Sequence, residues 1–135
     1  MELEFLTNDI ESGEYYEFGI TYNGLTHCFI IDWEPVIHEI LAEKSNKISL
    51  NLMSVKFHNG LVKAIMEIAE RVGEKQVLLS GGCFQNRYLL EKTVNELQKN
   101  DFKVYFQKNI PPNDGGISLG QIYFKLSGYE VSGFE

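Results

Sequence analysis

The segment from residue 73 to residue 106 constrains the fold most, because it reads as a strand, a helix and a second strand in direct succession. Residues 76–80 form a short, almost entirely apolar run, which is typical of a strand in a sheet that is covered on both faces. Residues 86–99 carry leucines and a valine at helical spacing, and residues 102–106 return to a strand pattern. Two strands joined by one helix predict a parallel pair with a right-handed crossover. We therefore expect an α/β fold.

An antiparallel hairpin is predicted ahead of this unit. Aromatic and β-branched residues fill two runs, 15–22 and 25–32, on either side of Asn23-Gly24. This dipeptide is typical of a two-residue type I′ turn, in which both central residues have positive φ. The sequence therefore predicts two strands that reverse sharply at Asn23-Gly24.

Two helices are predicted between the hairpin and the first parallel strand. Pro35 suits the first turn of one helix, which the polar residues 45–47 end. Ser49 is placed to cap the second helix and Gly73 to end it. The apolar side chains of the second helix form one stripe that we expect to face the core. These side chains are Met53, Phe57, Leu61, Ile65, Ile68 and Val72.

The whole chain, residues 1–135, is expected to form one domain. Its 135 residues, 44% of them hydrophobic, are enough for a single core. A last helix is predicted from about residue 114 to Leu126. The predicted order is thus β–β–α–α–β–α–β–α, an N-terminal hairpin followed by helices and a β-α-β-α unit.

Charge and composition exclude several classes of function. The formal net charge of −7, with lysines and arginines scattered among acidic residues, argues against nucleic acid as a partner. No apolar run approaches the roughly 18–20 residues that cross a bilayer, so no membrane association is expected. The first residues lack the basic-then-apolar order of a signal peptide, and Cys28 and Cys83 show no paired spacing. We therefore expect a cytoplasmic protein with reduced cysteines.

Two glycine-rich loops are expected at the carboxyl edge of the parallel strands, where open α/β sheets bind ligands. The first contains Ser80-Gly81-Gly82 and enters its helix at Asn86. Adjacent glycines permit positive φ and the close approach of a phosphate or sugar, and the helix start offers N–H groups to an anion. The same residues could form only a tight turn, with Asn86 as a plain N-cap.

The second loop, residues 110–116, presents Asp114 from a support stiffened by two prolines. A carboxylate there is an oxygen ligand suited to a divalent cation. Asn113 or Asp114 could instead cap the last helix, and capping is the favoured interpretation for this loop alone. Because both loops hold a glycine pair, Gly81-Gly82 and Gly115-Gly116, a nucleotide-sized site between them becomes the better prediction.

Three motifs resemble those of the HypF family of hydrogenase-maturation carbamoyltransferases. Residues 79–87, Leu-Ser-Gly-Gly-Cys-Phe-Gln-Asn-Arg, are similar to the family's LSGGVFQN signature, and residues 111–121 to its closing PPNDGG…LGQ motif. Phe57-His58 lies where the family carries a Phe-His pair. The resemblance covers residues 50–125 and is looser over residues 1–49.

The resemblance implies a TsaD-like carbamoyltransferase domain of the actin, Hsp70 and sugar-kinase superfamily, with this chain as its C-terminal lobe. Such a domain takes carbamoyl-adenylate made elsewhere in the same polypeptide. It passes the carbamoyl group to the C-terminal cysteine of HypE, on the route to the cyanide ligands of NiFe hydrogenase. The implied contacts with ATP or carbamoyl-adenylate are Ser80, Gly81, Gly82 and Asn86, and the implied metal ligand is Asp114. His58 and Gly115 are further possible site residues.

The chain also departs from the family. The family's metal-binding histidine pair belongs to the other lobe, and its acylphosphatase-like, zinc-finger and adenylate-forming domains have no counterpart in these 135 residues. The divalent metal (iron, zinc or magnesium) would then take its remaining ligands from outside this chain. His58 is favoured as a packed or capping histidine. Cys83, which replaces a valine of the family, is favoured as a small buried residue.

Two functions stay open at this stage. One is a carbamoyltransferase lobe that is inactive without the missing N-terminal lobe and domains of HypF. The other is a non-catalytic nucleotide-binding or docking lobe for a companion chain, whose exposed apolar face could also form a homodimer. A generic nucleotide-binding domain of the sugar-kinase superfamily ranks last, because it would not be expected to carry the loop at residues 111–116.

Overall fold

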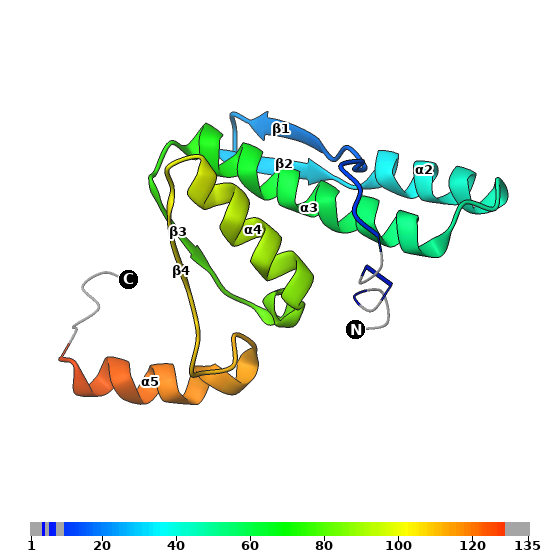
Figure 1. Ribbon diagram of the computed structural model, residues 1–135. Coiled ribbons are helices and arrows are strands. Elements are labelled where there is room, and N and C mark those ends of the chain that lie inside the picture. Colours follow the sequence, from blue (N-terminus) through cyan, green and yellow to red (C-terminus); the bar gives the residue numbers. More distant parts are fainter. Residues whose placement is uncertain (1–3, 5, 8–9, 129–135) are drawn as a thin grey trace.

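The elements of the chain follow the predicted order in the computed structural model, which describes residues 4, 6–7 and 10–128. They are β1 (Gly19–Asn23), β2 (Cys28–Asp32), α2 (Glu34–Ser45), α3 (Leu50–Val72), β3 (Gln76–Leu79), α4 (Arg87–Lys99), β4 (Lys103–Phe106) and α5 (Ile117–Leu126). Short 3₁₀ turns precede α4 and α5. Figure 1 shows the β1–β2 hairpin along α3, α4 packed beside α3, and α5 set apart at the far end of β4.

The predicted hairpin is present, but its strands begin later than expected, at Gly19 and Cys28, and its turn differs. The register pairs Asn23 with Cys28, so residues 24–27 form a four-residue loop. The Asn23 side chain accepts the N–H groups of Leu25 at 2.9 Å and Thr26 at 3.3 Å. Positive φ falls on His27, at 53°. The prediction of a two-residue type I′ turn is therefore wrong. The Asn23 side chain accepts hydrogen bonds from the loop N–H groups and so stabilises a longer turn.

Both predicted helices after the hairpin are present. α2 ends at Ser45, and α3 ends at Val72, with Gly73 as its C-cap at a left-handed φ of 79°. Ser49 precedes α3, although its side chain makes no capping hydrogen bond. The segment before the hairpin crosses α3 so closely that a Cβ on Gly60 would lie 2.4 Å from the carbonyl oxygen of Tyr16.

The buried face of α3 is not the predicted apolar stripe. Val72, at the end of that stripe, is 55% exposed, and several of its other members are only partly buried. The N-terminal segment and α4 cover a neighbouring face, on which polar side chains are buried together with valines and a methionine. The buried residues of α3 are Met53, Ser54, Val55, Lys56, His58, Asn59, Gly60, Val62, Ala64 and Met66.

The strands β3 and β4 pair in parallel, from Gln76 opposite Lys103 to Leu79 opposite Phe106. One face of this pair packs on α3 and α4. The buried cluster on that face is Met66, Leu79, Leu97 and Phe102. The other face is open to solvent, as the 68% exposure of Leu78 shows. The expectation that both faces are covered is therefore wrong for the described residues: α3 and α4 lie on the same side.

The fold is a mixed α/β domain with one parallel strand pair. Its place as the C-terminal lobe of an actin-like ATPase stays a prediction, as does the single-domain organisation of residues 1–135. None of the helices within the described part of the chain is long and apolar enough to cross a membrane.

Candidate functional site

The two glycine-rich loops are in contact at the carboxyl edge of β3 and β4. The Gly81 N–H donates to the carbonyl oxygen of Pro112 at 2.9 Å. A Cβ placed on Gly82 would lie 3.8 Å from the Cβ of Asn113. The structure thus brings together the two segments that the sequence places at one edge of the sheet.

The first loop needs glycine at position 81. Gly81 has φ 102° and ψ 159°, a region of backbone conformation open essentially to glycine alone. The 3₁₀ turn Gly82–Gln85 follows, and Gly82 is exposed. Ser80 is also exposed and donates its hydroxyl to Gln107 Oε1 at 3.4 Å. Residues 80–82 therefore offer an accessible stretch of backbone beside the second loop.

Asn86 joins this loop to α4. Its side-chain oxygen accepts the N–H of Leu89 at 2.9 Å, so Asn86 is the N-cap of α4. Its amide nitrogen lies 2.7 Å from Nε2 of His58. Of the two alternatives for Asn86, capping is the one that the structure shows, and half-buried Asn86 keeps a second amide N–H.

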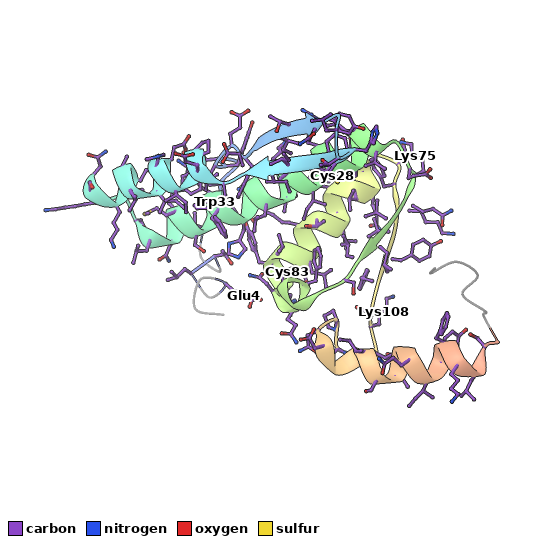
Figure 2. All side chains as sticks on the ribbon, turned by 180° about the vertical axis from the view of Figure 1, so that it is seen from behind. Glu4, Cys28, Trp33, Lys75, Cys83 and Lys108 are labelled. Atoms are coloured by element: carbon purple, nitrogen blue, oxygen red, sulfur yellow. The ribbon has the colours of Figure 1, made fainter. Side chains whose placement is uncertain are left out.

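The start of α4 also holds a carboxylate from the N-terminal segment. The N–H of Arg87 donates to Glu4 Oε1 at 2.7 Å, and Figure 2 labels Glu4 close to Cys83 of the preceding turn. The two residues are 83 positions apart, so no sequence pattern predicts this contact. It shows that the first turn of α4 accommodates an anionic oxygen, as the partial positive charge of a helix N-terminus favours.

The second loop is capped by Asn113, whose side-chain oxygen accepts the Gly115 N–H at 3.0 Å. Asn113 is thus the cap of the 3₁₀ turn Asp114–Gly116, and the exposed Asp114 carboxylate takes no part in capping. The last helix, α5, has Gly116 at its N-cap and no side-chain cap, so the cap predicted for that helix is wrong. A Cβ on Gly116 would lie 2.9 Å from the Pro111 carbonyl oxygen, so this loop conformation requires glycine there.

The described residues do not form a metal site by themselves. Within residues 4, 6–7 and 10–128, no group of three or more His, Cys, Asp and Glu side chains could hold a metal ion. Asp114 supplies a single carboxylate, whereas divalent cations in proteins take several oxygen or nitrogen ligands. A metal bound at Asp114 would need ligands from outside the described residues.

The predicted packing of His58 is confirmed, since the side chain is only 3% exposed. Its ring lies edge-on to Phe57 and Tyr88, with centroids 6.0 and 5.4 Å away. Its Nδ1 is 2.8 Å from the carbonyl oxygen of Ser54. Cys83, in contrast, is exposed at the surface of the first loop, so the buried position predicted for it is wrong.

Sequence reasoning missed Asn59, the neighbour of His58. Its amide nitrogen donates to the carbonyl oxygens of Ser12 at 2.9 Å and Glu14 at 2.7 Å. Its side-chain oxygen accepts from Lys92 at 2.7 Å and from Tyr88 at 3.2 Å. Asn59 thus ties the N-terminal segment to α3 and α4. No sequence signal pointed to it, because position 59 lies off the apolar stripe that the sequence predicts as the inner face of the helix.

A second polar cluster lies between α2, α3 and the N-terminal segment. Lys56 and Tyr16 both donate hydrogen bonds to the carboxylate of Glu43. Burial works to raise the pKa of Glu43, but these two hydrogen bonds prevail and hold it below its usual value of 4.5. Burial and the bond to Glu43 raise the pKa of Tyr16. We assign this cluster a structural role, because none of its residues belongs to either loop.

Residues 1–121 match the family described as "Carbamoyltransferase, Kae1-like Domain, second subdomain". The chain belongs to this family. A curated relative, Carbamoyltransferase HypF of Synechocystis sp., is 40% identical over 126 residues, which is 93% of this chain and 16% of the relative. The resemblance to HypF seen in the sequence is therefore confirmed, and the chain spans only a small part of that relative's length.

Solved HypF structures are similar to the chain as well. A crystal structure of full-length HypF in the phosphate- and nucleotide-bound form gives a TM-score of 0.80 at 37% identity, covering 98% of this chain and 18% of that one. HypF of T. kodakarensis gives a TM-score of 0.68 at 24% identity over 95% of this chain and 17% of that one, which supports the fold alone.

Proposed function

We propose that this chain is the part of a HypF carbamoyltransferase that binds ATP or carbamoyl-adenylate between residues 80–86 and residues 110–116. The observation that carries the proposal is the hydrogen bond from Gly81 to Pro112, because it joins two glycine-paired loops into one accessible surface. The similarity over 98% of the chain to a HypF structure in a phosphate- and nucleotide-bound form supports it.

Each site residue has a distinct part in this proposal. Ser80, Gly81 and Gly82 let the ligand approach the backbone, as small residues do in phosphate-binding loops. The first turn of α4 faces a phosphate, which would displace the Glu4 carboxylate from the Arg87 N–H. Asn86 donates its second amide hydrogen, and Gly115 keeps the facing loop free of a side chain.

In the proposed reaction the chain binds, orients and neutralises charge. The thiolate of the HypE C-terminal cysteine attacks the carbamoyl carbon, a carbon–sulfur bond forms, and the bond from that carbon to the adenylate phosphate oxygen breaks. AMP leaves with the electron pair. Backbone N–H groups of the first loop stabilise the phosphate charge as it develops. We propose that Asp114 gives one ligand to a divalent metal (iron, zinc or magnesium) whose other ligands come from the N-terminal lobe.

Calorimetric titration with ATP tests this assignment. We expect weak binding by the isolated chain, because it holds only one side of the proposed site. Gly82 has room for a side chain within the protein, so Gly82→Leu should keep the melting temperature and lower ATP affinity at least fivefold. Gly24→Leu, in the open hairpin loop, is the matched control. Micromolar ATP binding that survives Gly82→Leu, Asn86→Ala and Asp114→Asn would contradict the proposal.

One observation favours docking as a second function. The open face of the β3–β4 pair exposes Leu78 and Tyr105, and α5 exposes six further large apolar side chains. Such a surface suits the N-terminal lobe of HypF, or a second copy of this chain. Sedimentation of the chain alone separates the two: a dimer that Leu78→Lys converts to monomer identifies self-association, whereas a monomer that binds the remaining HypF domains identifies lobe docking.

A further inference from the structure

The orientation of the Asn86 amide follows from its contacts. The backbone N–H of Leu89 can only donate, so the atom 2.9 Å away from it must be the side-chain oxygen of Asn86. The other end of the amide, the NH₂ group, then points at His58 Nε2 at 2.7 Å. Turning the amide over would set two donors against each other at the helix start. The capping bond therefore fixes both ends of this side chain.

The protonation of the His58 ring follows in turn. An amide NH₂ group has no acceptor atom, so Nε2 must present its lone pair to Asn86. The ring proton must then sit on Nδ1, which lies 2.8 Å from the carbonyl oxygen of Ser54, a group that can only accept. His58 is thus a neutral imidazole with its hydrogen on Nδ1, bridging the α3 backbone to Asn86.

We infer that His58 is a positioning residue for the nucleotide loop, an inference that rests on the proposed function. Asn86 closes the 3₁₀ turn of the loop, through its N–H to Cys83, and opens α4, through its carbonyl oxygen to Leu90. A buried ring held between Phe57 and Tyr88 gives this junction a rigid anchor on α3. His58 does not touch the ligand; it sets the conformation in which residues 80–86 meet the phosphate.

Nitrogen-15 NMR of the histidine rings tests the tautomer without any nucleotide. We expect the His58 Nε2 signal at the position of an unprotonated acceptor nitrogen and the Nδ1 signal at that of a protonated one. Exposed His38 on α2 serves as the internal reference. A His58 ring with its proton on Nε2, or one that averages between both forms, overturns the inference.

The variants His58→Gln and His58→Met test the anchoring. They have side chains of similar length, but only glutamine offers Asn86 a strong acceptor. In His58→Met we expect hydrogen exchange of the Leu89 amide to accelerate about tenfold, the effect of losing one buried hydrogen bond. ATP affinity should fall about fivefold. His58→Gln should stay within about threefold of the wild type in both measurements, and amides of the β1–β2 pair should be unchanged in both variants.

The outcomes separate the two proposals. If both variants leave Leu89 exchange and ATP affinity at wild-type values, His58 does not position the loop. If the wild-type chain binds no ATP while Leu89 exchange still depends on the acceptor at position 58, the anchoring of Asn86 is upheld and the nucleotide proposal fails. Equal acceleration of exchange throughout the chain in His58→Met and His58→Gln would show general destabilisation and overturn the positioning role.

Discussion

The helices α4 and α5 follow similar segments in the sequence, but they differ in how much of their surface is buried in the structure. Each follows a parallel strand and a glycine-paired loop. α4 buries Leu89, Thr93 and Leu97, whereas no residue of α5 is buried. The side chains of α5 that stay exposed are Ile117, Leu119, Ile122, Tyr123, Phe124 and Leu126.

This difference means that the first glycine-paired loop leads into a packed helix and the second into an exposed one. The first loop leads into α4, which packs beside α3, while the second leads into α5, which Figure 1 shows set apart from the other helices. An apolar helix without a buried face is expected where further chain packs on it. The chain covers 16% of its Synechocystis relative, so such further chain exists in that protein.

The largest expected effect is a difference between substitutions in α4 and in α5 in the free energy of unfolding. Leu97→Ala should lower the free energy of unfolding by about 2–5 kcal/mol, because it opens a cavity in the core cluster. Ile122→Ala on α5 should change it by less than about 0.5 kcal/mol, as for other exposed substitutions. Urea unfolding measures both. Equal losses would mean that α5 is part of the folded core.

The next effect concerns the junction between the two regions. Gly81→Ala should cost about 1–3 kcal/mol, because alanine disfavours the φ of 102° that aligns the Gly81 N–H with Pro112. Gly24→Ala, with open space and no positive φ, is the matched control. Thermal unfolding of both variants measures the difference. A Gly81→Ala variant as stable as Gly24→Ala would show that the loops are not held together by this conformation.

The smallest expected effect is a change in how the free energy of unfolding depends on pH. Glu43 has a lowered pKa in the folded state, so its contribution to stability is present above pH 4.5 and is lost as the pH falls below that value. Glu43→Gln should therefore lower the unfolding free energy at pH 7 and flatten its decline toward acid. Glu70→Gln, exposed on α3, should keep the wild-type pH profile. Identical profiles for all three proteins would remove Glu43 from the account.

Local patterns predicted the order of the elements and the meeting of the loops, because strand, helix and glycine signals act over a few residues. The turn after Asn23 was predicted wrongly, since its own side chain decides the conformation. The open face at Leu78 could not be predicted either. An apolar strand indicates that its two faces need to be buried, but not which part of the chain buries them.

The site was predictable in its segments and less so in its contacts. Asn86 allowed both capping and ligand binding in the sequence, and Asn113 was one of two candidate caps. The structure shows Asn86 capping α4 and Asn113 capping the 3₁₀ turn Asp114–Gly116. The bonds of His58 to Asn86 and of Glu4 to Arg87 join residues 28 and 83 positions apart. Such contacts depend on how elements pack, which periodicity and spacing do not encode.

An ATP titration followed through the backbone amide signals of the chain tests the central claim most directly. If the two loops form one nucleotide site, the amides of Gly82 and Gly115 should shift together with a single midpoint, while those of the β1–β2 hairpin stay still. Shifts confined to one loop, or two loops responding with different midpoints, would contradict a shared site.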